Sequence, residues 1–254
     1  MERGSTASAS GADIFDDLEA EDERLEAVLA GLGAADWTAA SAAAGWTVAD
    51  VVVHLAQTDE AVTDTAAGGG LIELWGSRRD SLDAAVDQAV RADTAAPGVV
   101  FERWRQARRA ALAALRQADP DRALPWAATP LKPRVLATTR LAEHWIHGLD
   151  ITGPLDVAFP DTDRLRHVAW LAHRTLPYAW SLAGSEPHPV FCELTGPTGE
   201  VWTFGPADAP SAIRGPAGEF CRVGARRLAP EATHLNPEGP YAGAALRVLR
   251  TYAA

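Results

Sequence analysis

Three residues of types that bind divalent metals stand in two places of the chain: His54 in one, and Glu143 with His147 in the other. Glu143 and His147 are four residues apart, so on a helix both project from one face, one turn apart. His54 lies among apolar residues, where an imidazole without a partner would be costly. If the two segments pack together, two imidazoles and a carboxylate with an open fourth position describe a catalytic zinc site.

The neighbouring residues refine this expectation. His144 lies about 160° around the helix from its apolar stripe, so it should point outward, which favours Glu143 and His147 over His144 and His147 as the ligand pair. Asp150, one turn beyond His147, and Asp50, one turn before the first histidine, are candidate acceptors for imidazole N–H groups. Spacing alone leaves another interpretation open, because a histidine on an apolar face is often a hydrogen-bonded core residue.

Helices must position these residues. From residue 13 to about 184, apolar residues recur at three- and four-residue spacing between loops marked by Gly, Pro and Asp. Thr47 followed by Asp50 predicts a capped helix start just before the first histidine. The pattern predicts helices over roughly 14–32, 47–67, 80–92, 97–119, 133–151 and 162–182.

The pattern changes after residue 185. Residues 188–194 and 200–204 are rich in β-formers around a Gly- and Pro-containing turn, which predicts a hairpin, and 211–214 could add a strand. Two helices are expected near 216–228 and 240–252. The chain is therefore predicted to be mainly α: a disordered lead-in over 1–12, a helical bundle over 13–184, and a small α+β unit over 185–254 packed on the bundle.

Composition narrows the possible functions of the 254 residues. A net charge of −11 argues against a nucleic-acid partner or an anionic membrane surface. Residues 1–12 lack the pattern of a signal peptide and no apolar run is long enough to span a bilayer, so we expect a soluble, cytosolic protein. Cys192 and Cys221 lack metal-binding or disulfide spacing and are expected to be small buried side chains. Lys132 is the single lysine, which is typical of a GC-rich genome.

Four segments together resemble a known family. Residues 44–56, which contain His54, resemble the mycothiol-dependent maleylpyruvate isomerase branch of the DinB-like metalloenzymes. Residues 143–150 resemble the same branch. Residues 194–206 and 215–223 are similar to the sterol-carrier-like α+β domain that follows the bundle in many members. The resemblance covers nearly the whole chain from about residue 14.

The resemblance implies a DinB-like four-helix bundle that holds zinc, or a related divalent ion, through His54, Glu143, His147 and water. It implies that the thiol of mycothiol replaces the water, loses its proton and attacks an electrophilic carbon of a small substrate. The chain would then be a thiol-dependent S-transferase or isomerase. The GC-rich composition fits an actinobacterium, the kind of organism that makes mycothiol.

Family members often direct arginines from the C-terminal domain toward the cleft, which makes Arg222, Arg226 and Arg227 the candidates here. An arginine fork suits a substrate carboxylate, although each could equally be a solvated side chain. Arg222 and Arg226, with Asp150, are the predicted catalytic residues beside the metal. The tryptophans that could wall the cleft are Trp46, Trp126 and Trp145, although an aromatic residue at helical spacing is more often part of the core.

Two other functions are compatible with the same residues. The chain could be a metalloenzyme of secondary metabolism that uses the metal as a Lewis acid without a thiol. It could also be a non-catalytic protein that binds a small ligand around a structural metal. Three ligands with an open position argue against the second of these, because structural sites are usually closed by a fourth protein ligand.

Overall fold

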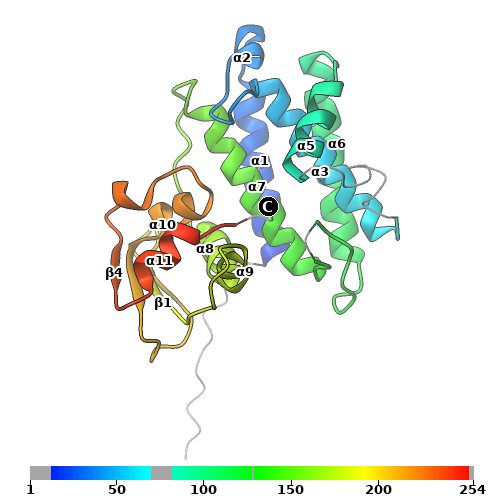
Figure 1. Ribbon diagram of the computed structural model, residues 1–254. Helices are drawn as coiled ribbons and strands as arrows, with labels where there is room; N and C mark the ends of the chain where they lie inside the picture. The colour runs from blue at the N-terminus through cyan, green and yellow to red at the C-terminus, as the bar shows by residue number, and fades with distance from the viewer. Residues whose placement is uncertain (1–12, 70–81, 128, 252–254) are drawn as a thin grey trace, which may run out of the picture.

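The computed structural model describes residues 13–69, 82–127 and 129–251 (Figure 1). The predicted disordered lead-in over 1–12 lies outside the described residues. Across the described ranges, no helix combines the length and the apolar character needed to cross a membrane.

Four long helices form the bundle, and α3 packs mainly on α6 while α1 packs mainly on α7 (Figure 1). The short helices α2 and α5 accompany them. Their bounds are α1 Ile14–Ala30, α2 Ala34–Thr38, α3 Val48–Ala66, α5 Leu82–Ala92, α6 Pro97–Gln117 and α7 Pro133–Thr152. The prediction of a mainly helical chain that begins with a four-helix bundle is confirmed.

Local sequence signals set where the site-bearing helices begin. Thr47 caps α3 by accepting from the backbone N–H of Asp50, and the Asp50 carboxylate accepts from the N–H of Thr47 in return. Pro133 occupies the first turn of α7, where a missing N–H costs nothing. Asp50 is therefore occupied as a capping residue, and the prediction that it accepts from His54 was wrong.

The helix predicted over 162–182 is two helices, α8 (Leu165–Arg174) and α9 (Leu176–Leu182), which meet at Thr175. Pro177 lies in the first turn of α9. Because proline has no N–H to donate to the carbonyl of His173, a continuous helix would be interrupted here. The break bends the chain between the bundle and the sheet.

A four-stranded sheet follows, in the order β2-β1-β3-β4. β1 and β2 form the predicted antiparallel hairpin, β1 and β3 are parallel, and β3 and β4 are antiparallel. The bounds are β1 Phe191–Thr195, β2 Val201–Phe204, β3 Ala212–Pro216 and β4 Asn236–Glu238. The sequence did not predict β4, because its three residues are exposed, include a proline and carry no alternating apolar pattern.

The two C-terminal helices are shorter than predicted: α10 spans Ala217–Gly224 and α11 spans Ala242–Val248. A 3₁₀ turn, η1, spans Pro230–Ala232 between them. α10 ends early because the chain turns at Arg226, whose φ of 59° lies in the left-handed region.

One apolar core joins the helical and the mixed part of the molecule. It runs from Trp145 of α7 through Leu171 of α8 to Cys192 of β1 and Phe220 of α10. α8 packs on both α7 and α10 (Figure 1), and the division near residue 184 stays a prediction. Cys192 and Cys221 are free and buried, as expected, and burial raises the pKa of Cys192 to about 12.

Candidate metal centre

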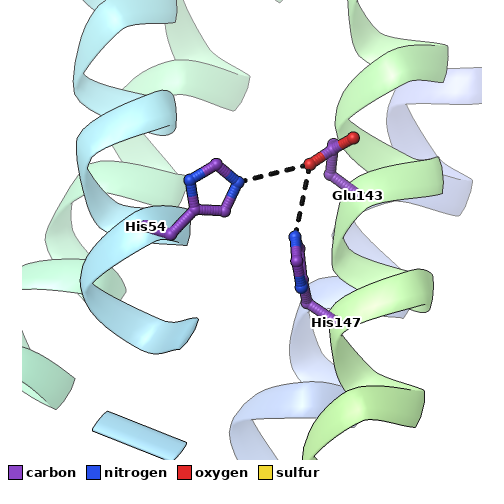
Figure 2. A group of neighbouring side chains, drawn as sticks. All are labelled: His54, Glu143 and His147. Atoms are coloured by element: carbon purple, nitrogen blue, oxygen red, sulfur yellow. Dashed lines mark hydrogen bonds and ion pairs between the residues drawn. The ribbon is translucent and has the colours of Figure 1, made fainter. Parts of the chain in front are cut away.

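Three donor side chains from two helices converge on one point (Figure 2). Nε2 of His54 on α3 lies 3.4 Å from Oε2 of Glu143 on α7, and Nε2 of His147 lies 3.5 Å from the same oxygen. All three donor atoms lie within 4.8 Å of one another. Ligands about 2.0–2.2 Å from a tetrahedral ion stand roughly 3.3–3.6 Å apart, so the spacing around Glu143 is that of a ligand set.

The electrostatics of the cluster match this arrangement. Burial lowers the pKa of His54, although the hydrogen bond to Glu143 opposes it. Burial alone would raise the pKa of Glu143, but hydrogen bonds from His147 and His54 hold it well below its usual range. Burial would also lower the pKa of His147, but its hydrogen bonds to Asp150 and Glu143 raise it. A neutral imidazole at His54 and an ionised carboxylate at Glu143 are the forms in which these two groups bind a metal.

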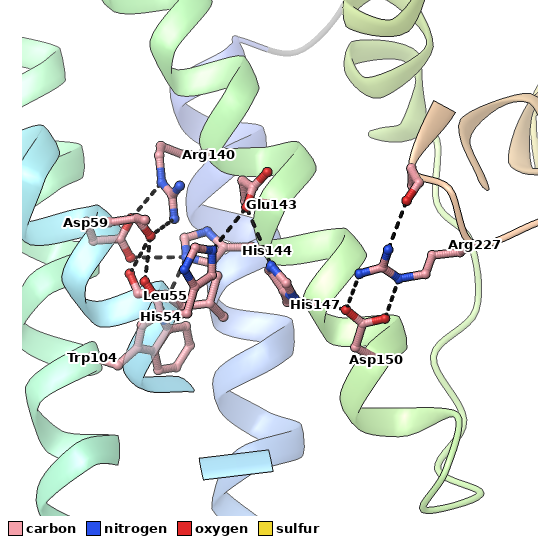
Figure 3. Close-up of polar contacts among 12 residues, drawn as sticks. His54, Leu55, Asp59, Trp104, Arg140, Glu143, His144, His147, Asp150 and Arg227 are labelled. Atoms are coloured by element: carbon pink, nitrogen blue, oxygen red, sulfur yellow. Dashed lines mark hydrogen bonds and ion pairs between the residues drawn. The ribbon is translucent and has the colours of Figure 1, made fainter. Parts of the chain in front are cut away.

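A chain of polar contacts fixes the orientation of His147 (Figure 3). Its Nδ1 lies 2.9 Å from Oδ2 of Asp150, which leaves Nε2 directed toward Glu143. Asp150 is fully buried and accepts from Nε and Nη2 of Arg227 at 2.6 and 2.7 Å. Burial would raise the pKa of Asp150, but the hydrogen bonds from Arg227 and His147 lower it. The structure thus places Asp150 where the sequence predicted an acceptor for His147.

The His54 side differs, because its Nδ1 is buried and has no hydrogen-bond partner among the described residues. The indole of Trp46 lies beside both imidazoles, with ring centroids 5.3 Å from His54 and 6.4 Å from His147. Its Nε1 donates to Asp87 of α5 at 2.9 Å. Trp46 therefore walls the site, which is one of the two alternatives that the sequence left open.

His144 does not point outward, which corrects the prediction made from helical periodicity. It does lie on a different face of α7 from His147, but α1, α3 and α6 pack over that face and leave it 1% exposed. Its Nδ1 is 2.7 Å from Asp22 and its Nε2 is 3.1 Å from Asp59. Arg140 also donates to Asp59, at 2.9 Å (Figure 3). Burial would lower the pKa of His144, but the two carboxylates raise it to about 9.

Asp22, Asp59 and Arg140 were not among the predicted residues. The sequence signal that could have found them is a charged residue on the buried face of an amphipathic helix: Asp22 and Asp59 occur in register with the buried positions of α1 and α3.

A cavity of about 730 Å³ opens over the three donor side chains. Trp46 and Trp126 line it, whereas Trp145 is a buried core residue, so the two alternatives for these tryptophans are both realised. Besides the cluster, Thr58 and Arg140, the wall includes Val86, Trp126, Leu131, Val135, Ile146, Leu171, Arg174, Tyr178 and Arg227.

The C-terminal arginines divide into one that reaches the cavity and two that do not. Arg227 lines the cavity and holds Asp150. Arg222 instead forms a bidentate ion pair with Asp161, at 2.7 and 2.9 Å. Arg226 donates to backbone carbonyls at the end of α11. The expectation that Arg222 and Arg226 face the cleft was wrong: Arg222 lies on the face of α10 that pairs with Asp161, and Arg226 lies in the left-handed turn after α10 ends at Gly224.

Comparison with known proteins agrees with this geometry. Residues 18–152, which contain all three donor residues, match the family described as mycothiol maleylpyruvate isomerase N-terminal domain. Over 244 residues the chain is 35% identical to an uncharacterized protein found in two strains of Mycobacterium tuberculosis, with 93% of this chain and 94% of the relative covered.

Solved structures show the same fold. The crystal structure of the mycothiol-dependent maleylpyruvate isomerase superposes with a TM-score of 0.61 at 16% identity, covering 89% of this chain and 93% of that chain. A mutant of that enzyme with a histidine replaced by alanine gives a TM-score of 0.59 at 15% identity, covering 89% and 95%. The family match, which covers more than half of the chain, shows that this chain belongs to the mycothiol maleylpyruvate isomerase N-terminal domain family.

Proposed function

We propose that this chain is a metal-dependent enzyme that uses a low-molecular-weight thiol, mycothiol, to isomerise or conjugate a small electrophilic substrate. The observation that carries the proposal is the convergence of His54, Glu143 and His147 on the floor of a cavity large enough for small molecules. The family membership and the shared fold with a mycothiol-dependent isomerase support it.

The three side chains fit a divalent ion of the zinc type. Two imidazole nitrogens and one carboxylate are a common catalytic zinc set, and the donors occupy the protein side while the cavity lies on the other. Bound there, such an ion would lower the pKa of a coordinated thiol or water and polarise a carbonyl group.

The protein's own residues then have separate tasks. Glu143 supplies the negative charge that partly balances the cation. Asp150 accepts from Nδ1 of His147 and so keeps Nε2 aimed at the site, and Arg227 keeps Asp150 in place. Trp46 and the apolar wall exclude water, which strengthens every electrostatic interaction inside the cavity.

Thermal unfolding in the presence of mycothiol or of its S-methyl derivative tests the proposal. Mycothiol should raise the melting temperature of the zinc-loaded protein, because a ligand that binds the folded state stabilises it. It should have little effect on the metal-free protein. S-methyl mycothiol, which has no ionisable thiol, is the control and should stabilise less.

If mycothiol and its S-methyl derivative stabilise equally, or neither does, thiol coordination is wrong and the Lewis-acid function takes its place. Product analysis of the zinc-loaded protein with a cis-configured enone, with and without mycothiol, then separates isomerase from transferase chemistry. An adduct that accumulates without isomerisation would indicate a transferase.

A further inference from the structure

Most of the charges around the cavity are neutralised within the protein. Arg140 is bound by Asp59, and Arg227 is bound by Asp150. Glu143, the one acidic side chain among the described lining residues, faces the two histidines. A substrate anion would therefore have to compete with a buried carboxylate for either of these two arginines.

Arg174 is the exception. It lines the cavity from the last turn of α8, is exposed to solvent, and forms no hydrogen bond or ion pair with any described residue. Its guanidinium lies over the ring of Trp170, with 5.3 Å to the centroid. Stacking on an aromatic ring orients the guanidinium and leaves its N–H donors available.

Most of the cavity wall is apolar. Val135 and Ile146 of α7 face the cavity together with Leu131, Leu171 and Trp126. Apolar surface of this kind favours an apolar ligand, and it disfavours a charged group that finds no partner.

We propose that the substrate is an amphipathic electrophile with an apolar body and a single anionic group, such as an aryl-substituted unsaturated monocarboxylate. The body lies against the wall around Val135 and Ile146, and Arg174 binds the carboxylate at the rim. A compact dicarboxylate fits less well, because the described lining residues offer no second free cation in the metal-free protein, and in the function proposed above the thiol takes the open position on the metal. The identification of this ligand as the substrate rests on the function proposed above. Binding of the ligand to the cavity does not require the metal.

Isothermal titration of the full-length protein with three probes tests this inference. The probes are trans-cinnamate, its neutral methyl ester, and fumarate as a compact dicarboxylate. After divalent ions are removed, cinnamate should bind about tenfold more tightly than either of the others. Arg174→Gln should weaken cinnamate binding about tenfold and leave the methyl ester unchanged.

Two further variants complete the design. Arg166→Gln removes an exposed arginine of the same helix that lies outside the cavity, and it should change none of the affinities. Val135→Thr keeps the shape of the wall but adds a hydroxyl, and it should weaken cinnamate and its ester equally. If fumarate binds as tightly as cinnamate, or if Arg174→Gln leaves the preference for cinnamate over its ester intact, the inference is overturned. Because these titrations use metal-free protein without thiol, their outcome is independent of the thiol experiment above.

Discussion

Two faces of α7 each bury a histidine beside charged side chains: His144 on one face and His147 on the other. The two environments differ in one respect. His144 is enclosed by α1, α3 and α6, and each of its nitrogens faces a carboxylate, Asp22 or Asp59. His147 uses one nitrogen for Asp150 and turns the other toward Glu143, His54 and the cavity. Burial and acidic partners are common to both. A donor atom left facing a cavity, beside other such donors, is what distinguishes a site for chemistry from a structural ion pair.

Charge distinguishes His144 from His54, the donor that α3 contributes to the cavity. A histidine whose pKa is raised to about 9 carries protons on both nitrogens at neutral pH and cannot bind a metal. Its positive charge, with that of Arg140, balances the two aspartates. The pKa of His54 is instead lowered by burial, which keeps its imidazole neutral. One face of the helix is a closed, neutralised network, and the other is an incomplete one.

The largest expected effect concerns metal binding. His54→Ala and Glu143→Gln should each reduce bound zinc from about one ion per chain to near zero, because each removes one of three ligands. Elemental analysis after dialysis measures this. His234→Ala, which alters an exposed histidine outside the cavity, is the control and should bind zinc normally. Normal zinc content in the first two variants would show that the metal is bound elsewhere.

Next in size is a loss of stability on the closed face. His144→Ala should lower the free energy of unfolding by about 3–5 kcal/mol, because it leaves Asp22 and Asp59 buried without the cation between them. In metal-free protein, His147→Ala should cost less than about 2 kcal/mol, since Arg227 still pairs with Asp150. Urea denaturation measures both. Equal losses would mean that the two faces do not differ as described.

A smaller effect is expected from the residue that orients His147. Asp150→Asn should weaken zinc binding by about 10–100-fold while the three ligands remain, which a chelator competition can measure. Asp161→Asn is a matched change, because Asp161 also pairs with an arginine of the C-terminal part but lies outside the cavity. A weakening of zinc binding in Asp161→Asn as large as in Asp150→Asn would contradict an orienting role for Asp150.

The smallest effect is predicted for Arg222. Arg222→Gln removes a partly exposed ion pair with Asp161, which should change the free energy of unfolding by less than about 1 kcal/mol. Zinc affinity should not change. Thermal unfolding and chelator competition test both statements, and a loss of zinc binding would place Arg222 back among the site residues.

Some of the site could be predicted because its signals are local. The four-residue spacing of Glu143 and His147 fixes their common face on any helix, and Asp150 follows His147 within the same turn region. The position of His54 required a further assumption, that its helix packs beside α7. The resemblance to the family supplied that assumption.

The errors arose where packing between distant segments decides the outcome. Periodicity showed that His144 faces away from the cavity, but not that α1, α3 and α6 cover it. The choice among Arg222, Arg226 and Arg227 depended on where α10 ends, and a left-handed residue after Gly224 is not visible in the apolar pattern. β4 forms through pairing with β3, some twenty residues earlier, rather than through its own sequence.

The central claim is that the donors on the open face hold a metal that a thiol can reach. Cobalt(II) in place of zinc reports this directly, because a coordinated thiolate gives a charge-transfer band in the near ultraviolet. Titration with mycothiol should produce that band and saturate near one equivalent per chain, in the native protein but not in His54→Ala, and S-methyl mycothiol should produce none. A cobalt spectrum that stays unchanged as mycothiol is added would contradict the account.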